Sequence, residues 1–558
     1  MVELMTKAGE TLTGTPWNCY PRPQMKRENW LNLNGAWDFA VNYENMGKIL
    51  VPFCPESKLS RIGTHYEEGS ALSYTRNFSL PEGFNRGRVI LHIGAADQRA
   101  DVFLNGKPVG YHQGGYEAFS VDITEHLQAE NRLQIICFDD LTDQSYPYGK
   151  QTMNRGGMWY TPVSGIWQTV WLESVPETYI RKLHIENRGY GVTIAIEPAL
   201  TGLVKVAELG EFPLVDGKVT ITPENPRLWS PEDPYLYDFS IEAGEDKIES
   251  YFAIRSLEIK KVGKYPRLCL NGKPYFFHGL LDQGYWPDGL FTPATPECYA
   301  EDILEMKRLG FNTLRKHIKV EPEEFYYQCD KLGMVVFQDM VNNGDYGYLR
   351  DTVLPTFFRQ HKNDRRMHPH QATRKAFLEG MEATVRQLKN HPSICYWTIF
   401  NEAWGQFDST PVYHRLKELD SSRFIDTTSG WFRGSVSDVE SLHIYFDMWH
   451  RLKPSKKPIV LSEFGGFTYA APGHIWNPDN SYGYGGCKTP EALTARLREI
   501  YEKRVIPAAQ KGLCASVYTQ ISDVEDEING LLTYDRKVCK PDKKAMLAIA
   551  AALKKALA

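Results

Sequence analysis

The sequence predicts three parts: an N-terminal jelly-roll β-sandwich, a small immunoglobulin-like β-sandwich and a C-terminal (β/α)8 TIM barrel. The chain has 558 residues, enough for about three domains. Short apolar runs separated by turn residues fill its first part, as in all-β domains. Later in the chain, apolar strands alternate with amphipathic helices, the pattern of α/β folds. We therefore expect a multidomain protein with β and α/β parts.

The first predicted domain covers residues 1–180. Runs such as 88–94 (RVILHIG) and 133–139 (LQIICFD) are rich in Val, Ile, Leu and Phe, which favour strands. Asn105-Gly106 lies between two such runs and is a strong hairpin signal. Helical periodicity is absent, so a jelly-roll sandwich is the expected architecture.

Residues 181–257 are predicted to form the second, smaller sandwich. Runs such as GVTIAIE (191–197) and YLYDFSIEA (235–243) alternate apolar and polar residues, as half-buried antiparallel strands do. Five to seven strands in about 75 residues fit an immunoglobulin-like fold.

Residues 258–558 are predicted to form the barrel. Eight apolar strands with helices between most of them match its strand count and size. No Gly-rich phosphate turn follows the first strand, so a doubly wound sheet fits less well. We expect strands at 274–281, 312–317, 334–340, 393–401, 424–430, 441–446, 458–464 and 513–520, and helices at 296–308, 321–333, 377–390, 411–419, 489–511 and 541–557.

Composition and charge argue against several classes of protein. The chain has 64 Lys and Arg against 69 Asp and Glu, a net charge of −5, so we expect no nucleic-acid partner. No run of about 18 apolar residues is present, so we expect no membrane span. Residues 1–14 lack the apolar run of a signal peptide, and the ten cysteines form no CxxC pair. These features favour a cytoplasmic protein with reduced thiols.

Ionisable side chains at strand ends form the candidate site, because TIM-barrel active sites lie at the carboxyl ends of the strands. These residues are Asp282, Arg315, Lys316, His317, Asp339, Glu402, His443, Glu463 and Asp523. Glu402 and Glu463 differ from the rest because each ends an apolar run, where an unpaired buried carboxylate costs several kcal/mol. They follow the fourth and seventh strands and are expected to meet in the mouth. Retaining glycoside hydrolysis requires such a pair, one carboxyl group as acid and the other as nucleophile.

Several segments carry a resemblance to a known family. They are YPRPQMKRENWLNLNGAWDF (20–39), WYTPVSGIWQTVWLE (159–173), FNTLRKH (311–317), KNHPSICYWTIFNEAWG (389–405) and VLSEFGG (460–466). In these segments the chain resembles glycoside hydrolase family 2, which includes bacterial β-galactosidases and β-glucuronidases. The resemblance covers essentially the whole chain and implies a retaining exo-β-glycosidase with a sugar-binding type of first domain.

The resemblance also implies roles for individual residues. Glu402 matches the family's general acid/base and Glu463 its nucleophile. Asn401 matches the residue that binds the sugar 2-hydroxyl, and Tyr445 matches a tyrosine near the nucleophile. Trp404 is a candidate platform on which the sugar could stack. The remaining substrate-binding candidates are His317, Asp282, Asp339, Tyr518 and Lys316.

Two departures from the family affect the expected sugar. Tyr518 stands where relatives usually carry a tryptophan, and Leu531 stands where β-glucuronidases carry the lysine of an Asn-x-Lys motif. Because an uncompensated carboxylate in a closed pocket costs several kcal/mol, we expect a neutral β-galactoside. The alternative is a β-hexuronidase, acting on β-glucuronides or β-galacturonides, for which the RKHIK run (315–319) supplies three cations and a histidine beside the second strand. Arg315 and Lys316 could equally be structural ion-pair partners, and a mannoside is also left open.

No cofactor or metal site is expected. HExxH is missing, and His368 and His370 are too close in a loop to be a convincing ligand pair. The expected partner is a small-molecule or oligosaccharide β-glycoside. A non-catalytic carbohydrate-binding protein is the alternative from another class, but it would have little reason to keep both glutamates. The oligomeric state is left open, with a homo-oligomer among the alternatives.

Overall fold

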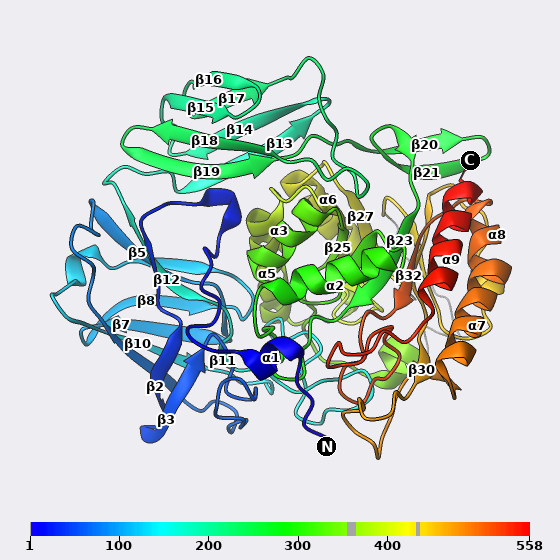
Figure 1. The fold of residues 1–558 in the computed structure, drawn as a ribbon, viewed down its shortest axis with the longest axis horizontal. Helices are drawn as coiled ribbons and strands as arrows, with labels where there is room; N and C mark the ends of the chain where they lie inside the picture. Colours follow the sequence, from blue (N-terminus) through cyan, green and yellow to red (C-terminus); the bar gives the residue numbers. More distant parts are fainter. Residues whose placement is uncertain (1, 354–363, 431–435, 558) are drawn as a thin grey trace.

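The computed structural model describes residues 2–353, 364–430 and 436–557. It contains two β-sandwiches and a parallel barrel surrounded by helices, as the sequence predicts (Figure 1). No helix within the described ranges is long and apolar enough to cross a membrane.

The first sandwich consists of two antiparallel sheets, with strand orders β1-β12-β5-β9 and β3-β2-β4-β10-β7-β8. Asn105 and Gly106 adopt φ values of 53° and 79° between β7 and β8, which confirms the hairpin. The elements within residues 1–180 are α1 (Lys7–Thr11), β1 (Trp30–Asn32), β2 (Gly35–Val41), β3 (Glu44–Val51), β4 (Leu72–Phe78), β5 (Arg88–Ile93), β6 (Ala96–Asp97), β7 (Arg99–Leu104), β8 (Lys107–Gln113), β9 (Phe119–Asp122), β10 (Asn131–Phe138), β11 (Gly165–Ile166) and β12 (Val170–Val175), of which β6 and β11 form a separate two-stranded sheet.

The second sandwich packs the sheet β13-β14-β17 against the sheet β16-β15-β18-β19. The buried residues of β18 alternate with more exposed ones, as the sequence pattern predicts. The proposed boundary at 257/258 falls at the start of β20, which pairs with β21, and β21 in turn pairs with β22 before the barrel begins. The strands are β13 (Lys182–Arg188), β14 (Gly191–Glu197), β15 (Gly202–Val206), β16 (Gly210–Leu214), β17 (Lys218–Ile221), β18 (Tyr237–Ala243), β19 (Asp246–Phe252), β20 (Leu257–Val262), β21 (Tyr265–Leu270) and β22 (Lys273–Pro274).

The barrel is a parallel eight-stranded sheet in the order β27-β26-β25-β24-β23-β32-β29-β28. Its end strands, β27 and β28, approach each other through a 3.4 Å contact between the hydroxyl oxygens of Ser429 and Ser441. The barrel is therefore nearly closed. Its strands are β23 (Phe277–Asp282), β24 (Thr313–Lys316), β25 (Val335–Asp339), β26 (Ile394–Asn401), β27 (Phe424–Ser429), β28 (Glu440–Ile444), β29 (Ile459–Gly465) and β32 (Leu513–Thr519), and β30 (Phe467–Tyr469) pairs with β31 (Tyr484–Cys487) beside it.

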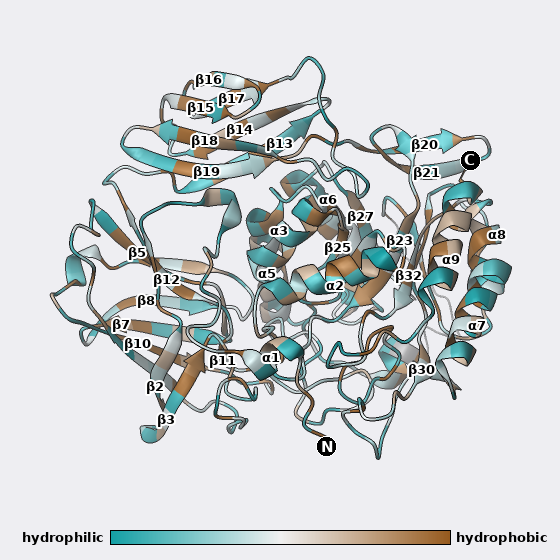
Figure 2. Cartoon of the chain, in the orientation of Figure 1, coloured by the Kyte–Doolittle hydropathy of each residue, from teal (hydrophilic) through white to brown (hydrophobic). Residues whose placement is uncertain are grey.

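The helices pack around the barrel, and in Figure 2 helices such as α2 carry both hydrophobic and hydrophilic residues. α3 ends at Gly333, whose φ of 73° provides the left-handed C-cap. The helix expected over 489–511 is interrupted by a π-helical turn at Tyr501–Val505, just before Pro507, which lacks the N–H needed to continue regular bonding. The helices are α2 (Glu297–Arg308), α3 (Glu323–Leu332), α5 (Gln371–Leu388), α6 (Ser409–Leu419), α7 (Pro490–Ile500), α8 (Ile506–Ala509) and α9 (Lys543–Ala556).

Candidate active site

Two glutamates lie together at the carboxyl-terminal mouth of the barrel. Glu402 directly follows β26, and Glu463 lies near the end of β29. A carboxylate oxygen of each lies within 4.8 Å of the other and of a ring nitrogen of His443. Retaining glycosidases separate their carboxyl groups by about 5–5.5 Å, whereas inverting enzymes need about 6.5–9.5 Å to admit a water molecule. The arrangement therefore suits the retaining mechanism.

The backbone turns Glu402 out of the strand that precedes it. Its φ of 52° lies in the left-handed region, which non-glycine residues seldom adopt outside functional sites and turns. The Glu402 side chain is 14% exposed, whereas that of Glu463 is 5% exposed. The more exposed carboxyl group is the one that can reach both a leaving group and water.

Glu463 is held as an anion. Its Oε1 accepts a hydrogen bond from Arg315 Nη1 at 2.9 Å, and its Oε2 accepts one from the Tyr445 hydroxyl at 2.5 Å. Burial has the largest influence and raises the pKa of Glu463, but the positive charges of His443 and Arg315 and the hydrogen bonds outweigh it and lower the pKa to about 2. A carboxylate that stays ionised is what a nucleophile requires.

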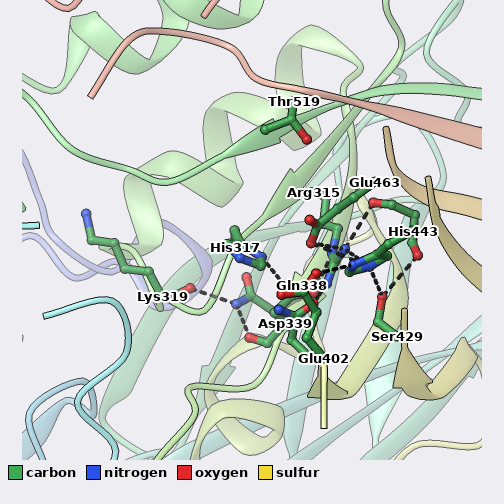
Figure 3. A network of polar contacts seen from close by, with 12 residues as sticks. Arg315, His317, Lys319, Gln338, Asp339, Glu402, Ser429, His443, Glu463 and Thr519 are labelled. Carbon is green, nitrogen blue, oxygen red and sulfur yellow. Dashed lines mark hydrogen bonds and ion pairs between the residues drawn. The ribbon is translucent and has the colours of Figure 1, made fainter. Parts of the chain in front are cut away.

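Arg315 links several of the predicted site residues (Figure 3). Besides Glu463, it donates to Asp339 Oδ1 at 3.0 Å and to Asn401 Oδ1 at 2.8 Å. Asp339 in turn contacts His317 Nδ1 at 2.7 Å. Burial lowers the pKa of the guanidinium most strongly, but Asp339 and Glu463 more than compensate, and the net shift is upward. Arg315 therefore remains charged and fixes the positions of its partners.

His443 connects the two glutamates. Its Nδ1 lies 2.7 Å from Glu402 Oε1, and its Nε2 lies 3.5 Å from Glu463 Oε1 and 2.9 Å from the Ser429 hydroxyl. His443 was among the ionisable residues expected at strand ends, but no role was predicted for it. Its neighbour two positions on, Tyr445, was recognised, and the period-two alternation of strands could have indicated that His443 faces the same side.

Lys316 and Asp282 do not join this group. Lys316 Nζ pairs with Asp282 Oδ2 at 2.7 Å and with Glu321 Oε1 at 2.8 Å, and it lies 4.3 Å from the centre of the Phe325 ring of α3. Successive strand residues face opposite sides, so Lys316 points out of the barrel while Arg315 points into it. The structural ion-pair interpretation left open by the sequence fits this placement.

Two predicted aromatic residues are enclosed. Trp404 is 2% exposed, its Nε1 donates to Gly344 O at 3.0 Å, and the edges of Trp159 and Tyr346 pack against its ring. Tyr518 is fully buried, and its hydroxyl accepts a hydrogen bond from the Phe467 N–H. A sugar could not stack on either ring in this arrangement.

Thr519, rather than Tyr518, reaches the site from β32. Its Oγ1 lies 2.9 Å from the Tyr445 hydroxyl, which also binds Glu463. The residue predicted to stand at the position of the family's tryptophan was Tyr518, one position away from the inward-facing Thr519. Alternation along β32 separates the two side chains.

Residues of the first sandwich also approach the barrel mouth. The Tyr160 hydroxyl donates to Glu527 Oε2 at 2.5 Å, in the segment after β32. The Trp159 ring lies 5.1 Å from that of Trp404, and Lys150 Nζ lies 5.4 Å from the centre of the Trp159 ring. Trp159 and Tyr160 begin one of the segments that resemble the family, but no local pattern indicates their contacts with the barrel, whose strands lie more than 100 positions away in the sequence.

Metal binding can be judged on the ligand atoms present. Within the described ranges, Glu402, His443 and Glu463 form the one group of three potential ligands that lie close enough together. Arg315 Nη1 lies 2.9 Å from Glu463 and 3.4 Å from His443, so its positive charge already occupies this space. A second cation would be repelled there, and the donor set fits a metal poorly.

Family models match three consecutive segments of the chain. Residues 61–176 match "Glycosyl hydrolases family 2, sugar binding domain", and residues 183–255 match "Glycosyl hydrolases family 2". Residues 261–538 match "Glycosyl hydrolases family 2, TIM barrel domain". The matches follow the two sandwiches and the barrel in order.

Curated relatives include glycosidases of two kinds. A β-galactosidase of Thermoanaerobacter pseudethanolicus is 24% identical over 79% of this chain, and the chain spans 60% of that protein's length. A β-glucuronidase of Homo sapiens is 26% identical over 71% of this chain and 69% of its own. Further β-glucuronidases match at similar identity, including one of Bacteroides fragilis at 23%.

Solved structures share the fold along nearly the entire chain. The β-D-glucuronidase of Dictyoglomus thermophilum superposes with a TM-score of 0.74 at 19% identity, covering 96% of this chain and 98% of its own. A family 2 β-galacturonidase from Eisenbergiella tayi, bound to galacturonate, superposes with a TM-score of 0.67 at 18% identity, covering 96% and 99%. At these identities the superpositions establish the architecture.

Proposed function

The chain belongs to glycosyl hydrolase family 2 and is a retaining glycoside hydrolase, and we propose that it releases glucuronate or galacturonate from the ends of β-linked hexuronides. The observation that carries the mechanism is the pairing of Glu402 and Glu463 at the barrel mouth, with carboxylate oxygens within 4.8 Å. The glycone assignment rests on the relatives.

Two displacements follow from this geometry. In the first, the Glu463 carboxylate attacks the anomeric carbon while the Glu402 carboxyl proton passes to the departing glycosidic oxygen, giving a glycosyl ester on Glu463 and a free alcohol. In the second, the Glu402 carboxylate takes a proton from water, whose oxygen attacks the anomeric carbon and releases Glu463. The net β-configuration is retained.

The neighbouring residues have complementary roles in this mechanism. Arg315 and Tyr445 stabilise the Glu463 anion before attack and after release. Asn401, oriented by Arg315, is positioned to bind the sugar 2-hydroxyl. His443 holds the Glu402 carboxyl group at 2.7 Å and so positions it toward the leaving group.

The expectation of a neutral galactoside needs correction. Most of the similar proteins and solved structures are β-glucuronidases, and two of the similar structures are of a β-galacturonidase. These names favour the hexuronide alternative. A β-galactosidase remains the second candidate, supported by the relative of that name and by the missing Asn-x-Lys motif.

Matched substrates test the glycone. We expect kcat/KM for nitrophenyl β-glucuronide or β-galacturonide to exceed that for the corresponding glucoside or galactoside by about 10²-fold or more, because charge-assisted hydrogen bonds to a carboxylate are strong. A higher kcat/KM on the neutral galactoside would overturn the hexuronide proposal and favour the second candidate.

A further inference from the structure

A segment of the first sandwich is fixed to the barrel mouth. The N–H groups of Tyr148 and Gly149 both donate to Asn342 O at 3.2 Å, just beyond β25. The Tyr148 hydroxyl donates to Gly344 O at 2.8 Å. A Cβ atom placed on Gly149 would lie only 2.9 Å from the backbone oxygen of Ile318, just beyond β24, so the two backbone segments are in close contact. Lys150 therefore begins above the ends of the second and third barrel strands.

The same segment reaches the opposite side of the mouth. Tyr160 N–H donates to Lys150 O at 3.0 Å, and the Tyr160 hydroxyl binds Glu527 in the segment after β32. Trp159 packs on Trp404, two residues beyond the proposed acid/base. Lys150 is thus bracketed by residues that follow the fourth and eighth strands.

The charges of Lys150 and Glu463 both influence one neighbouring carboxyl group, that of Glu527. Burial raises the pKa of Glu527 most strongly, and hydrogen bonds from Tyr160 and Asn529 oppose the rise. The positive charge of Lys150 also opposes the rise, whereas the negative charge of Glu463 adds to it. Lys150 and Glu463 therefore both lie near enough to Glu527 for their charges to influence its pKa.

The Lys150 side chain is unusual among the buried lysines. Lys150 is 9% exposed, yet within the described ranges its ammonium group makes no hydrogen bond and no ion pair. Its contact is with the Trp159 ring, at 5.4 Å. By contrast, Lys319 pairs with Glu321 at 3.0 Å and Lys540 pairs with Asp523 at 2.6 Å. A cation–π contact offsets only part of the cost of burying an ammonium group, so an anionic ligand would complete this site.

We propose that Lys150 binds the C6 carboxylate of the hexuronide, an inference that rests on the proposed function. The position of the missing Asn-x-Lys lysine cannot serve, because Leu531 is fully buried. Arg315 cannot serve either, because Asp339, Asn401 and Glu463 occupy its guanidinium group. Lys150 supplies a positive charge that has no ion-pair partner among the described residues, at the same mouth but from a different domain. It is a specificity-determining residue, since a neutral sugar offers it no counter-charge.

The test compares substrates that differ only at C6. Wild-type protein, Lys150→Met and the charge-preserving Lys150→Arg are assayed with nitrophenyl β-glucuronide against β-glucoside, and with β-galacturonide against β-galactoside. Lys150→Met should lower kcat/KM on the preferred hexuronide by about 10- to 100-fold, the usual range for a charge-assisted hydrogen bond. It should change the neutral glycosides by less than about threefold, and Lys150→Arg should keep most of the hexuronide preference. Lys316→Met serves as a matched control at a paired buried lysine and should leave the hexuronide-to-neutral ratio unchanged.

The outcomes separate the two proposals. If wild-type protein prefers hexuronides and Lys150→Met keeps that preference, the role of Lys150 is overturned and the proposed function stands. If wild-type protein prefers neutral glycosides, the proposed function fails and the role of Lys150 fails with it. If thermal melting shows that Lys150→Met folds poorly, Lys150→Gln replaces it. The preference for a charged ligand is then measured as the ratio of the inhibition constants of free glucuronate and free glucose, compared with the ratio for wild-type protein. An equal loss on charged and neutral ligands would indicate a structural role and would also overturn the inference.

Discussion

The two faces of β24 carry similar residues with different partners: Arg315 lies on the inner face of the barrel and Lys316 on the outer face. Arg315 and Lys316 are adjacent cations, both 1% exposed, and each pairs with two carboxylates. Arg315 points into the barrel and binds the nucleophile candidate Glu463. Lys316 points outward and joins Asp282 and Glu321 beneath α3. Charge and burial alone therefore do not identify a catalytic cation, and the side of the strand on which it lies decides its role.

The largest expected effect is on the inner face. Glu463→Ala removes the group that forms the glycosyl ester, so we expect kcat to fall by about 10⁴-fold or more. In wild-type protein, a 2-deoxy-2-fluoro hexuronide with a good leaving group should leave a covalent label on Glu463, which peptide mapping would locate. A label on Glu402 or Asp523 would show that Glu463 is not the nucleophile.

Glu402→Ala should have the next largest effect, and it should depend on the leaving group. General acid catalysis is typically worth about 10²–10⁴-fold, so hydrolysis of alkyl glycosides should fall by that factor. Activated aryl glycosides need little protonation, so their first step should be less affected, and azide should rescue the second. Equal losses on both substrate types without azide rescue would argue against the acid/base role.

On the outer face, Lys316→Met should act on stability. Removing one partner of a buried ion pair typically costs about 3–5 kcal/mol, because Asp282 and Glu321 lose a counter-charge. Denaturant unfolding would measure this loss, and Lys261→Met, at an exposed lysine, is the matched control. A selective loss of kcat/KM on hexuronides without a loss of stability would instead place Lys316 in the sugar site.

The smallest expected effect is a shift in the pH dependence of kcat/KM when Tyr445, which contacts Glu463 inside the barrel, is replaced. Tyr445→Phe removes a hydrogen bond to the ionised Glu463, and such bonds to charged groups are worth about 1.5–3 kcal/mol, equivalent to about one to two pKa units. Because this bond lowers the pKa of Glu463, the acidic limb of kcat/KM should move to higher pH in the variant. An unchanged acidic limb would mean that Tyr445 does not stabilise the anion.

Much of the architecture could be predicted because its signals are local. Each of the eight barrel strands was expected from an apolar run, and each is present within a few residues of its predicted bounds. The hairpin at Asn105-Gly106 and the C-cap at Gly333 follow from the backbone freedom of those residues. The later start expected for α5, at 377 instead of Gln371, shows the usual uncertainty where a helix begins in polar sequence.

The site was only partly predictable, for reasons of orientation. Asn401, His317, Asp339 and Tyr445 join the two glutamates as expected. Tyr518 was chosen where Thr519 faces the site, because strand register cannot be read to a single residue from an apolar run. Trp404 is predicted as a stacking platform, but Trp159 from another domain packs against its ring.

The sequence by itself determined the family, the barrel and the pair Glu402 and Glu463, because a carboxylate at the end of an apolar strand is a local pattern with few inexpensive structural explanations. Only the tertiary structure decided that Arg315 binds Glu463 inside the barrel while Lys316 pairs with Asp282 and Glu321 outside it. It also decided that Lys150, from the first sandwich, lies at the barrel mouth without a partner in the described ranges. These outcomes depend on which face of a strand is enclosed and on contacts between distant segments. Such contacts are set by the packing of whole domains and leave no pattern in the neighbouring residues.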